Sequence, residues 1–301
     1  MEKIGKIIAV QGATGQQGNA AARNLLKQGW QVRALTRDVT KPAAKALADL
    51  GAQIVRTDND DRASLEAALR GAYGVYAVQN PWLSGDGVQG ETRQGKLIAD
   101  VAKSVHIQHF VYASVGGADR SSGLAHFESK WQIEQHIRSL GLPATVLRPV
   151  FFMDNFNWSR PYLLNGAFAT IGMRPGRALQ MIGVEDIAAF TALALDNPRE
   201  WAGKALELAG DELTEQQMVE ILGRVIGRPV QVTPQQSWGG SDEIRAEQQK
   251  SVDWFNGPGY QADIPALRKL YPGLHTFEQW LGLTGWENAP APDLSKVQAW
   301  S

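Results

Sequence analysis

The sequence contains no cysteine at any of its 301 positions. Disulfide bonds, thiol nucleophiles and zinc–thiolate sites are therefore excluded, and redox chemistry would require a bound cofactor. An excess of charge of one sign is also missing, because 30 basic residues face 31 acidic ones and leave a net charge of -1. That balance provides no electrostatic surface for nucleic acid or for an anionic membrane, so neither is an expected partner.

Long hydrophobic runs are absent as well. No apolar stretch approaches the roughly 20 residues that a transmembrane helix requires. The first residues, Met1 to Gly5, lead directly into a strand pattern without the apolar core of a signal peptide. We find neither an internal repeat nor a low-complexity segment. We therefore expect a cytoplasmic protein with one large domain or two modest ones.

The most informative segment follows the first apolar run and precedes a helical pattern. Its sequence is Gly12-Ala13-Thr14-Gly15-Gln16-Gln17-Gly18. Three glycines with this spacing, between a strand and a helix, predict a pyrophosphate-binding turn. Gly12 permits the tight turn, Gly15 lets the backbone approach the phosphates, and Gly18 lets the helix pack closely on the sheet. The helix N-terminus then offers N–H groups and the positive end of its dipole to the anion.

Short apolar runs alternate with amphipathic stretches through the first half of the chain. The expected strands are Ile7–Gln11, Gln31–Thr36, Gln53–Thr57, Gly74–Gln79, His109–Ser114 and Ala144–Pro149. The expected helices are Gln17–Gln28, Pro42–Leu50, Arg62–Leu69, Val88–Ser104 and His126–Leu140. Strands that are apolar throughout are typical of a parallel sheet covered on both faces. The pattern predicts an α/β fold, with a doubly wound parallel Rossmann sheet over residues 1–155.

After Pro149 the alternation is irregular, and residues 156–301 are expected to form a smaller C-terminal α+β domain for a substrate or partner. Some of its elements are expected to return to the Rossmann sheet. One unit is clear, with a turn over residues 209–211 between its first strand and its helix. Its elements are a strand over Ala205–Leu208, a helix over Thr214–Ile226 and a strand over Val230–Thr233. Thr214 is the expected N-cap, with Gln217 as its capping-box partner.

The end of the second strand indicates which dinucleotide is preferred. NAD-selective proteins of this fold carry an acidic residue there, about 20 residues past the glycines, for the ribose 2′-hydroxyl. Here the position holds Arg37, whose guanidinium can bind a 2′-phosphate in two hydrogen bonds and stack on adenine. Lys41 adds a second cation, while Asp38 lies one position beyond the strand end. The sequence favours NADP over NAD, against the alternative that Arg37 is an ordinary solvated arginine.

Two further strand ends supply polar residues. Asp58 or Asn59, after the third strand, could hydrogen-bond the adenine amino group. Asp60 or Asp61 could instead cap the next helix. Gln79 follows the fourth strand, on the side of the ribose and nicotinamide.

These features together resemble the NmrA-like family, an atypical branch of the short-chain dehydrogenase/reductases, and are closest to its HSCARG-type NADPH-sensing branch. The likeness runs over at least residues 4–225. It rests on the glycine turn, Arg37 and three later segments, which are residues 110–117 (FVYASVGG), 126–130 (HFESK) and 147–156 (LRPVFFMDNF). The resemblance implies an NADP(H)-preferring Rossmann domain with a small C-terminal domain. By motif position it implies cofactor contacts at Gly12, Ala13, Thr14, Gly15, Gln16, Gln17, Gly18, Arg37, Lys41, Asp58, Asn59, Gln79, Lys130, Phe152, Met153, Asp154 and Asn155.

The superfamily's catalytic motif is Tyr-x-x-x-Lys on a helix, with a serine after the fifth strand. This chain has Lys130 and Ser114, but His126 occupies the tyrosine position. Lys130 is therefore a candidate for holding the nicotinamide ribose. His126 is either a proton donor, as an imidazole titrating near neutral pH, or only the first residue of its helix. The other histidines lack metal-ligand spacing, so no metal site is expected.

Two functions fit this sequence. One is a non-catalytic NADP(H) sensor, in which the cofactor alters a surface that a regulatory protein partner reads. The other is an NADPH-dependent reductase of a quinone, carbonyl or similar small-molecule electrophile, which can dispense with a catalytic tyrosine if the acceptor takes its proton from water. A homodimer is compatible with either.

Overall fold

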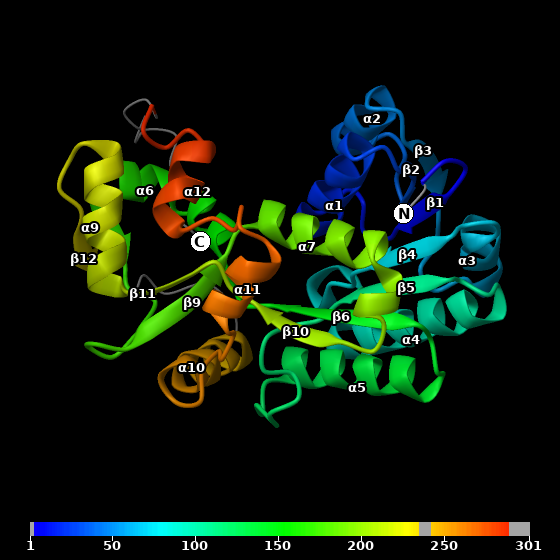
Figure 1. Ribbon diagram of the computed structural model, residues 1–301. Coiled ribbons are helices and arrows are strands. Elements are labelled where there is room, and N and C mark those ends of the chain that lie inside the picture. The colour runs from blue at the N-terminus through cyan, green and yellow to red at the C-terminus, as the bar shows by residue number, and fades with distance from the viewer. Residues whose placement is uncertain (1–2, 235–241, 289–301) are drawn as a thin grey trace. The chain divides into compact units, whose positions relative to one another are not determined.

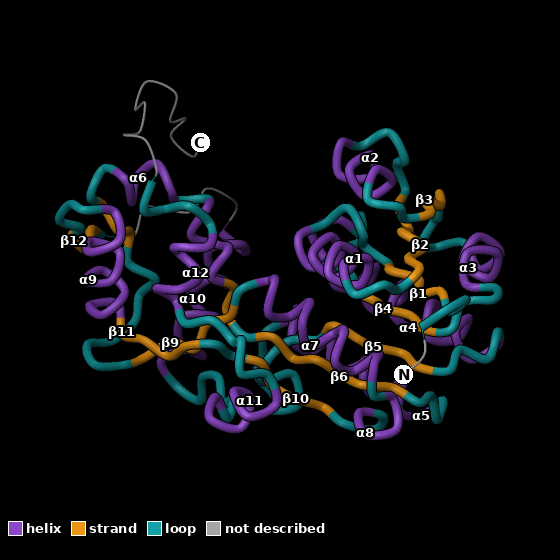
Figure 2. The backbone as a smooth tube through the Cα atoms, turned by 45° about the horizontal axis from the view of Figure 1, so that its top comes forward, coloured by secondary structure: helices purple, strands orange, loops and turns teal. Residues whose placement is uncertain are grey.

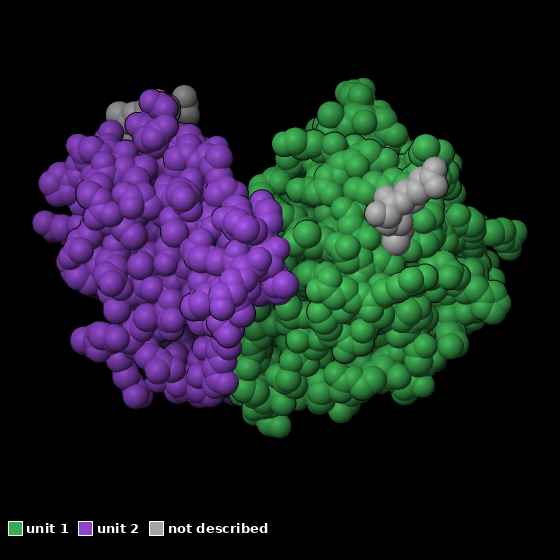
Figure 3. All heavy atoms as spheres, viewed as in Figure 1, with its two compact units in different colours: residues 1–149, 184–207 green, residues 150–183, 208–301 purple. Residues whose placement is uncertain are grey.

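The computed structural model describes residues 3–234 and 242–288. The chain divides into two compact units (Figure 3). Unit 1 comprises residues 1–149 and 184–207, and unit 2 comprises residues 150–183 and 208–301. The sequence placed the boundary after residue 155, whereas the units divide after Pro149. The segment 184–207 belongs to unit 1, in line with the expectation that some later elements return to the Rossmann sheet.

Unit 1 is built on a seven-stranded sheet (Figure 1). Its strands are β1 (Ile7–Val10), β2 (Gln31–Thr36), β3 (Gln53–Arg56), β4 (Gly74–Ala77), β5 (His109–Ala113), β6 (Ala144–Pro149) and β10 (Ala205–Leu208). The order is β10-β6-β5-β4-β1-β2-β3, and the pairs among β1 to β6 are parallel. The strand order reverses between β1 and β4, where Val10 is paired with Tyr76. Ligands of such sheets bind at the carboxyl ends of the strands beside this switch point.

Helices cover both faces of this sheet (Figures 1 and 2). They are α1 (Gln16–Lys27), α2 (Pro42–Asp49), α3 (Arg62–Leu69), α4 (Gly87–Ser104), α5 (Ala125–Ser139), α7 (Val184–Asp196) and the short α8 (Pro198–Trp201). On one face α1 packs against α7, and on the other α4 packs against α3 and α5. The doubly wound Rossmann fold is thus confirmed, and the six strands and five helices predicted for the first half lie within two residues of their expected bounds.

One long helix of unit 1 was missed by the sequence analysis. α7 lies in the segment that appeared irregular after Pro149. Ten of its 13 residues are buried, including Ile187, Phe190 and Leu195. A helix that is apolar on nearly every side has little of the 3.6-residue periodicity by which amphipathic helices are recognised.

Unit 2 combines two small sheets with helices. One sheet has the order β11-β9-β7 and the other pairs β12 with β8. The strands are β7 (Phe151–Phe152), β8 (Ala167–Ala169), β9 (Ala178–Ile182), β11 (Asp211–Thr214) and β12 (Gln231–Thr233). The helices are η2 (Met153–Asn157), α6 (Arg160–Leu164), α9 (Glu215–Ile226), α10 (Asp242–Asn256), α11 (Ile264–Leu270) and α12 (Phe277–Leu283). The core of unit 2 includes Phe277, Trp280 and Trp286.

Two local predictions for unit 2 had different outcomes. The capping box at the start of α9 is confirmed, because Thr214 accepts a hydrogen bond from the backbone N–H of Gln217 and the Gln217 side chain binds back to Thr214. The expected turn over residues 209–211 is wrong at its last residue. Asp211 already begins β11, which pairs antiparallel with β9. The short polar sequence of β11 carries no strand signal of its own, and its pairing depends on the distant β9.

A buried histidine in β5 makes the stability of the protein depend on pH. His109 is fully buried, and its Nε2 lies 3.0 Å from the Thr145 hydroxyl. Burial lowers the pKa of His109 from its ordinary value of 6.5 to about 4. Between pH 4 and pH 6.5 the unfolded chain binds a proton that the folded chain excludes. The folded state is therefore most stable with respect to this histidine above about pH 6.5, and its free energy of unfolding falls as the pH drops towards 4.

We expect this histidine alone to make the free energy of unfolding about 2 kcal/mol lower at pH 5 than at pH 7. His109→Gln, which retains a hydrogen-bonding group without titrating, should remove that part of the pH dependence. His106→Asn, at an exposed histidine with φ of 58°, is the control. Urea unfolding at both pH values provides the measurement. An unchanged pH dependence in His109→Gln would contradict the assignment.

Candidate functional site

The glycine turn follows β1 at the switch point. Its three glycines have different structural roles. Gly12 has φ of +70°, and a Cβ there would lie 2.8 Å from Val78 Cγ1. A Cβ on Gly18 would lie 2.2 Å from the carbonyl oxygen of Gly12, so only glycine lets α1 approach the turn. A Cβ on Gly15 would meet nothing closer than 3.4 Å. The packing of the protein therefore explains Gly12 and Gly18, while Gly15 leaves open the space that an approaching phosphate needs.

The N-terminus of α1 is suited to an anion. Gly15 is its N-cap, so no side chain caps the first N–H groups, and the first turn contains no acidic residue. Other residues of the turn are fixed by neighbours. The Thr14 hydroxyl lies 3.4 Å from that of Thr36, and Asn19 donates to the carbonyl of Ala13 at 3.4 Å. The first N–H groups, which no side chain caps, and the helix dipole fit a pyrophosphate.

The end of β2 presents two exposed cations. Arg37 follows directly after β2, and Lys41 is the N-cap residue of α2. The carboxylate of Asp38 accepts hydrogen bonds from the Thr40 hydroxyl at 2.6 Å and the Thr40 N–H at 2.9 Å. These bonds, with the nearby charges of Lys41 and Arg56, lower the pKa of Asp38. The carboxylate of Asp38 is therefore hydrogen-bonded within its own turn. Arg37 follows the strand end at which proteins of this fold discriminate between the riboses of NAD and NADP.

The acidic run after β3 has divided roles. Asp61 caps α3 by accepting from the Ala63 N–H at 2.9 Å, which settles which residue of the run is the cap. Asp60 instead binds Arg93 Nε at 2.9 Å and Gln94 Nε2 at 2.8 Å on α4. Although burial raises the pKa of Asp60, these bonds lower it overall. Asp58 accepts from the Asp60 N–H at 3.0 Å, and Asn59 beside it is half-buried.

Lys130 lies in a buried polar cluster between α4 and α5. Its Nζ donates to the carbonyl of Gln79 at 2.9 Å and lies 2.9 Å from Glu91 Oε1. Glu91 is fully buried, and its second oxygen accepts a hydrogen bond from the Ser129 hydroxyl. Lys130 Nζ also lies 5.6 Å from the ring centroid of Tyr112, whose pKa is raised well above its ordinary value by burial and by nearby carboxylates. The ammonium is thus fixed at the carboxyl end of β4 by a carboxylate that the sequence analysis did not identify.

Ser114 belongs to a second buried cluster. Its hydroxyl donates to Glu134 Oε1, and Glu134 is fully buried on α5. Arg148 binds Glu134 with two nitrogens, at 3.0 Å from Nε and 2.6 Å from Nη2, and also pairs with Asp119. The hydroxyl of Ser114 is therefore directed to a carboxylate inside the protein.

A pair of buried amides lies at the switch point itself. Gln11 follows β1 and Gln79 follows β4, and Gln79 Nε2 donates to Gln11 Oε1. Among the described residues, Gln11 Nε2 and Gln79 Oε1 have no hydrogen-bond partner. Gln11 thus positions Gln79. The sequence analysis did not single out Gln11, because it lies in the expected strand Ile7–Gln11.

His126 is the second residue of α5 and is half-buried. Its ring meets that of Phe127 edge-on at 4.7 Å and lies 6.4 Å from the ring of Trp82, measured between centroids. Lys130 is one helical turn further along α5, so the spacing of the superfamily's catalytic pair is retained with an imidazole in place of a phenol.

The expected contacts Phe152 to Asn155 belong to unit 2. Phe152 is the last residue of β7, where it is paired with Ile182 of β9. Met153 is fully buried in the core of unit 2, while Asp154 is half-buried and Asn155 is exposed on η2.

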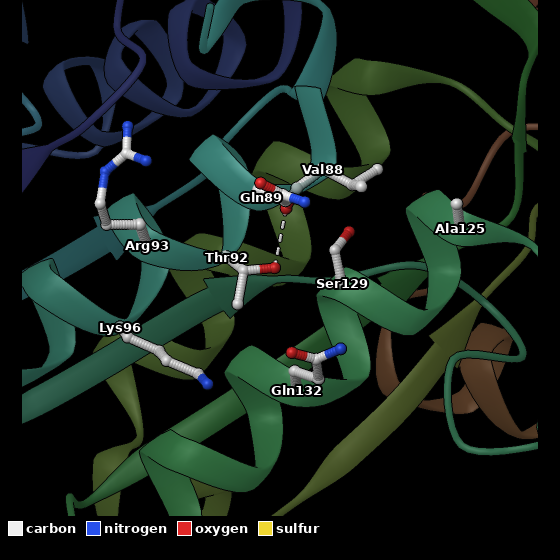
Figure 4. Close-up of a pocket in the computed structure, with 8 residues that line it drawn as sticks. All are labelled: Val88, Gln89, Thr92, Arg93, Lys96, Ala125, Ser129 and Gln132. Carbon is white, nitrogen blue, oxygen red and sulfur yellow. Dashed lines mark hydrogen bonds between the residues drawn. The ribbon is translucent and has the colours of Figure 1, made fainter. Parts of the chain in front are cut away.

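A groove of about 360 Å³ lies on unit 1 between α4 and α5 (Figure 4). It is lined by Val88, Gln89, Thr92, Arg93, Lys96, Ala125, Ser129 and Gln132. The Thr92 hydroxyl donates to the carbonyl of Val88 at 2.8 Å. The groove contains none of the residues of the glycine turn, but Ser129 connects it to the cluster of Glu91 and Lys130.

Two other kinds of site were sought. Within residues 3–234 and 242–288, no three histidine or acidic side chains gather in a way that could hold a metal ion. In the same residues, no helix has the length and apolar character needed to cross a membrane.

The fold and the turn together define a class. A doubly wound parallel sheet with a glycine turn and an uncapped helix at its switch point is the architecture of dinucleotide-binding proteins. Within that class, the chain belongs to the NmrA-like family, whose model matches residues 5–281.

The chain is similar to several relatives and solved structures. An NmrA-like family domain-containing oxidoreductase of Aspergillus hancockii is 31% identical over 256 residues, which cover 77% of this chain and 76% of that protein. The structure of NmrA, described as a negative transcriptional regulator, superposes with a TM-score of 0.80 at 20% identity, covering 98% of this chain and 99% of NmrA. An NADPH-dependent quinone oxidoreductase of Escherichia coli, solved with NADPH, superposes with a TM-score of 0.78 at 24% identity over 92% of this chain and 99% of that one. The last two similarities concern the fold.

Proposed function

We propose that this protein is an NADPH-dependent reductase of quinones or similar small electrophiles. The observation that carries the proposal is the site at the switch point, where Gly15 leaves space for a phosphate and α1 begins without a capping side chain. Two similarities support it. The relative from Aspergillus hancockii is named an oxidoreductase, and the Escherichia coli protein of the same fold is an NADPH-dependent quinone oxidoreductase.

Different residues of unit 1 would bind different parts of the cofactor. The N–H groups at the start of α1 would hold the pyrophosphate, and Arg37 with Lys41 would bind the 2′-phosphate. Lys130, fixed beside the end of β4, would hold the nicotinamide ribose. When bound, NADPH would supply a hydride to the acceptor. Positioning of the two reactants is then the main contribution of the protein.

The acceptor class follows from the proton donors on this chain. His126 takes the place of the phenol one turn before Lys130, and its ring packs against those of Trp82 and Phe127. The Ser114 hydroxyl donates to Glu134. A quinone suits such a site, because addition of a hydride yields a hydroquinone anion that is stable until it takes a proton from water. A simple aliphatic ketone would need an acid at its oxygen.

A second candidate is an NADP(H) sensor that regulates a protein partner. It is favoured by the imidazole at the tyrosine position and by the engagement of Lys130 and Ser114 with buried carboxylates. The fold is also that of NmrA, which is described as a negative transcriptional regulator. The sensor would need the cofactor site but no turnover.

One measurement separates the two candidates. Purified protein is given NADPH or NADH with a panel of quinones, aliphatic carbonyls and no acceptor, and the loss of reduced cofactor is followed. We expect quinone-dependent oxidation of NADPH with turnover on the order of 1 s⁻¹ or more. Tight NADPH binding without turnover on any acceptor would contradict the reductase and favour the sensor.

A further inference from the structure

An exposed tryptophan follows β4 at the carboxyl end of the sheet. The side chain of Trp82 is 73% exposed, in the short helical turn η1 (Pro81–Leu83). Hydrogen bonds fix the backbone around Trp82. Asn80 accepts a hydrogen bond from the Trp82 N–H at 2.9 Å, and the Ser84 hydroxyl donates to the carbonyls of Pro81 at 3.0 Å and Gly87 at 2.6 Å. Single exposed apolar side chains are common, so the exposure of Trp82 alone does not indicate a binding site. Its position in the fold does.

That position is tied to the residues of the proposed active site. The Trp82 and His126 rings are 6.4 Å apart and inclined by 44°. His126 is one helical turn before Lys130, and Lys130 Nζ binds the carbonyl of Gln79, three residues before Trp82. The His126 ring also meets the ring of Phe127 edge-on, with the two centroids 4.7 Å apart. His126 therefore lies one helical turn before the lysine that would hold the nicotinamide ribose, and Trp82 follows the strand end next to the switch point.

We infer that Trp82 and His126 form an aromatic shelf that binds the ring of a planar aromatic acceptor. The inference rests on the proposed function and names the substrate class of that same site. An indole presents a large face, on which a flat conjugated ring gains dispersion and quadrupole attraction that an aliphatic chain does not. The shelf selects acceptors by ring area, so a fused two-ring quinone binds better than a single-ring quinone, and an aliphatic diketone binds poorly.

The test compares two variants with a matched control. Steady-state oxidation of NADPH is measured with 1,4-naphthoquinone, 1,4-benzoquinone and 2,3-butanedione for the wild type, Trp82→Ala and Trp82→Phe. Leu50→Ala is the control, because Leu50 is also a largely exposed apolar residue of unit 1, at 56%, but it ends α2 before β3 begins, at the opposite end of the sheet. We expect Trp82→Ala to raise KM for naphthoquinone about tenfold with little change in kcat. Trp82→Phe should recover most of the loss, and NADPH affinity should be unchanged in every variant.

A binding measurement keeps this inference distinct from the proposed reaction. The affinity of 1,4-dihydroxynaphthalene for the NADP⁺ complex is determined by calorimetry for the same proteins. If the wild type turns over no acceptor but Trp82→Ala weakens this binding about tenfold, the reductase proposal fails and the aromatic shelf stands. If Trp82→Ala leaves both KM and this affinity unchanged, or if Leu50→Ala causes an equal loss, the aromatic shelf is refuted.

Discussion

Replacement of Arg37 by glutamate is expected to abolish the preference for NADPH over NADH. Arg37 directly follows β2, where the sheet selects between a ribose 2′-hydroxyl and a 2′-phosphate. The change removes a charge-assisted hydrogen-bonding group and places a carboxylate against the phosphate. Together these effects should reduce NADPH affinity at least a hundredfold, or about 3 kcal/mol, while NADH affinity changes little. Titration of both cofactors by fluorescence provides the measurement.

Two further variants make the result specific. Arg37→Lys keeps the charge but loses the planar pair of donors, so it should show an intermediate loss. Arg70→Glu introduces the same charge change at an exposed arginine after α3 and should leave both affinities unchanged. Asp38 should not compensate, because its carboxylate is bound to Thr40. Unchanged NADPH affinity in Arg37→Glu would show that Arg37 is only a solvated arginine.

The sheet of unit 1 could be predicted because its signals are local. Each of its first six strands contains at least two consecutive apolar residues, and glycines such as Gly29 and Gly141 follow the helices that precede β2 and β6, with φ of 84° and 60°. The glycine turn was equally clear. α7 and β11 could not be found in this way, since one is buried on nearly every side and the other exists through pairing with β9.

The sequence supplies candidate binding residues, but it did not reveal the buried charges beside them. Glu91 and Glu134 each occur in an amphipathic helix, where a lone glutamate is usually solvated. Only the packing of α4 and α5 shows that both carboxylates are fully buried and that each binds a cation. The roles of Lys130 and Ser114 depend on these partners, so sequence motifs alone described those two residues incompletely.

The buried pair of Lys130 and Glu91 is expected to have a large effect on stability. Removal of one member leaves an uncompensated charge in the interior, so Lys130→Met and Glu91→Gln should each cost about 3–5 kcal/mol of unfolding free energy. The double variant contains neither charge and should be about 3 kcal/mol more stable than the sum of the single losses implies. The exposed pair of Arg62 and Glu66, 2.9 Å apart, is the matched control and should show a coupling below about 1 kcal/mol.

The same double variant separates the structural role of Lys130 from its role in binding. The double variant should remain folded. Its NADPH affinity therefore reports the loss of the ammonium without the destabilisation that an unpaired Glu91 would cause. If Lys130 holds the nicotinamide ribose, the affinity should fall about ten- to a hundredfold, the effect of one charge-assisted hydrogen bond. Urea unfolding and cofactor titration on the four proteins of the cycle give both quantities. A strong stability coupling with unchanged NADPH affinity would show that Lys130 only joins α5 to α4 and to the end of β4.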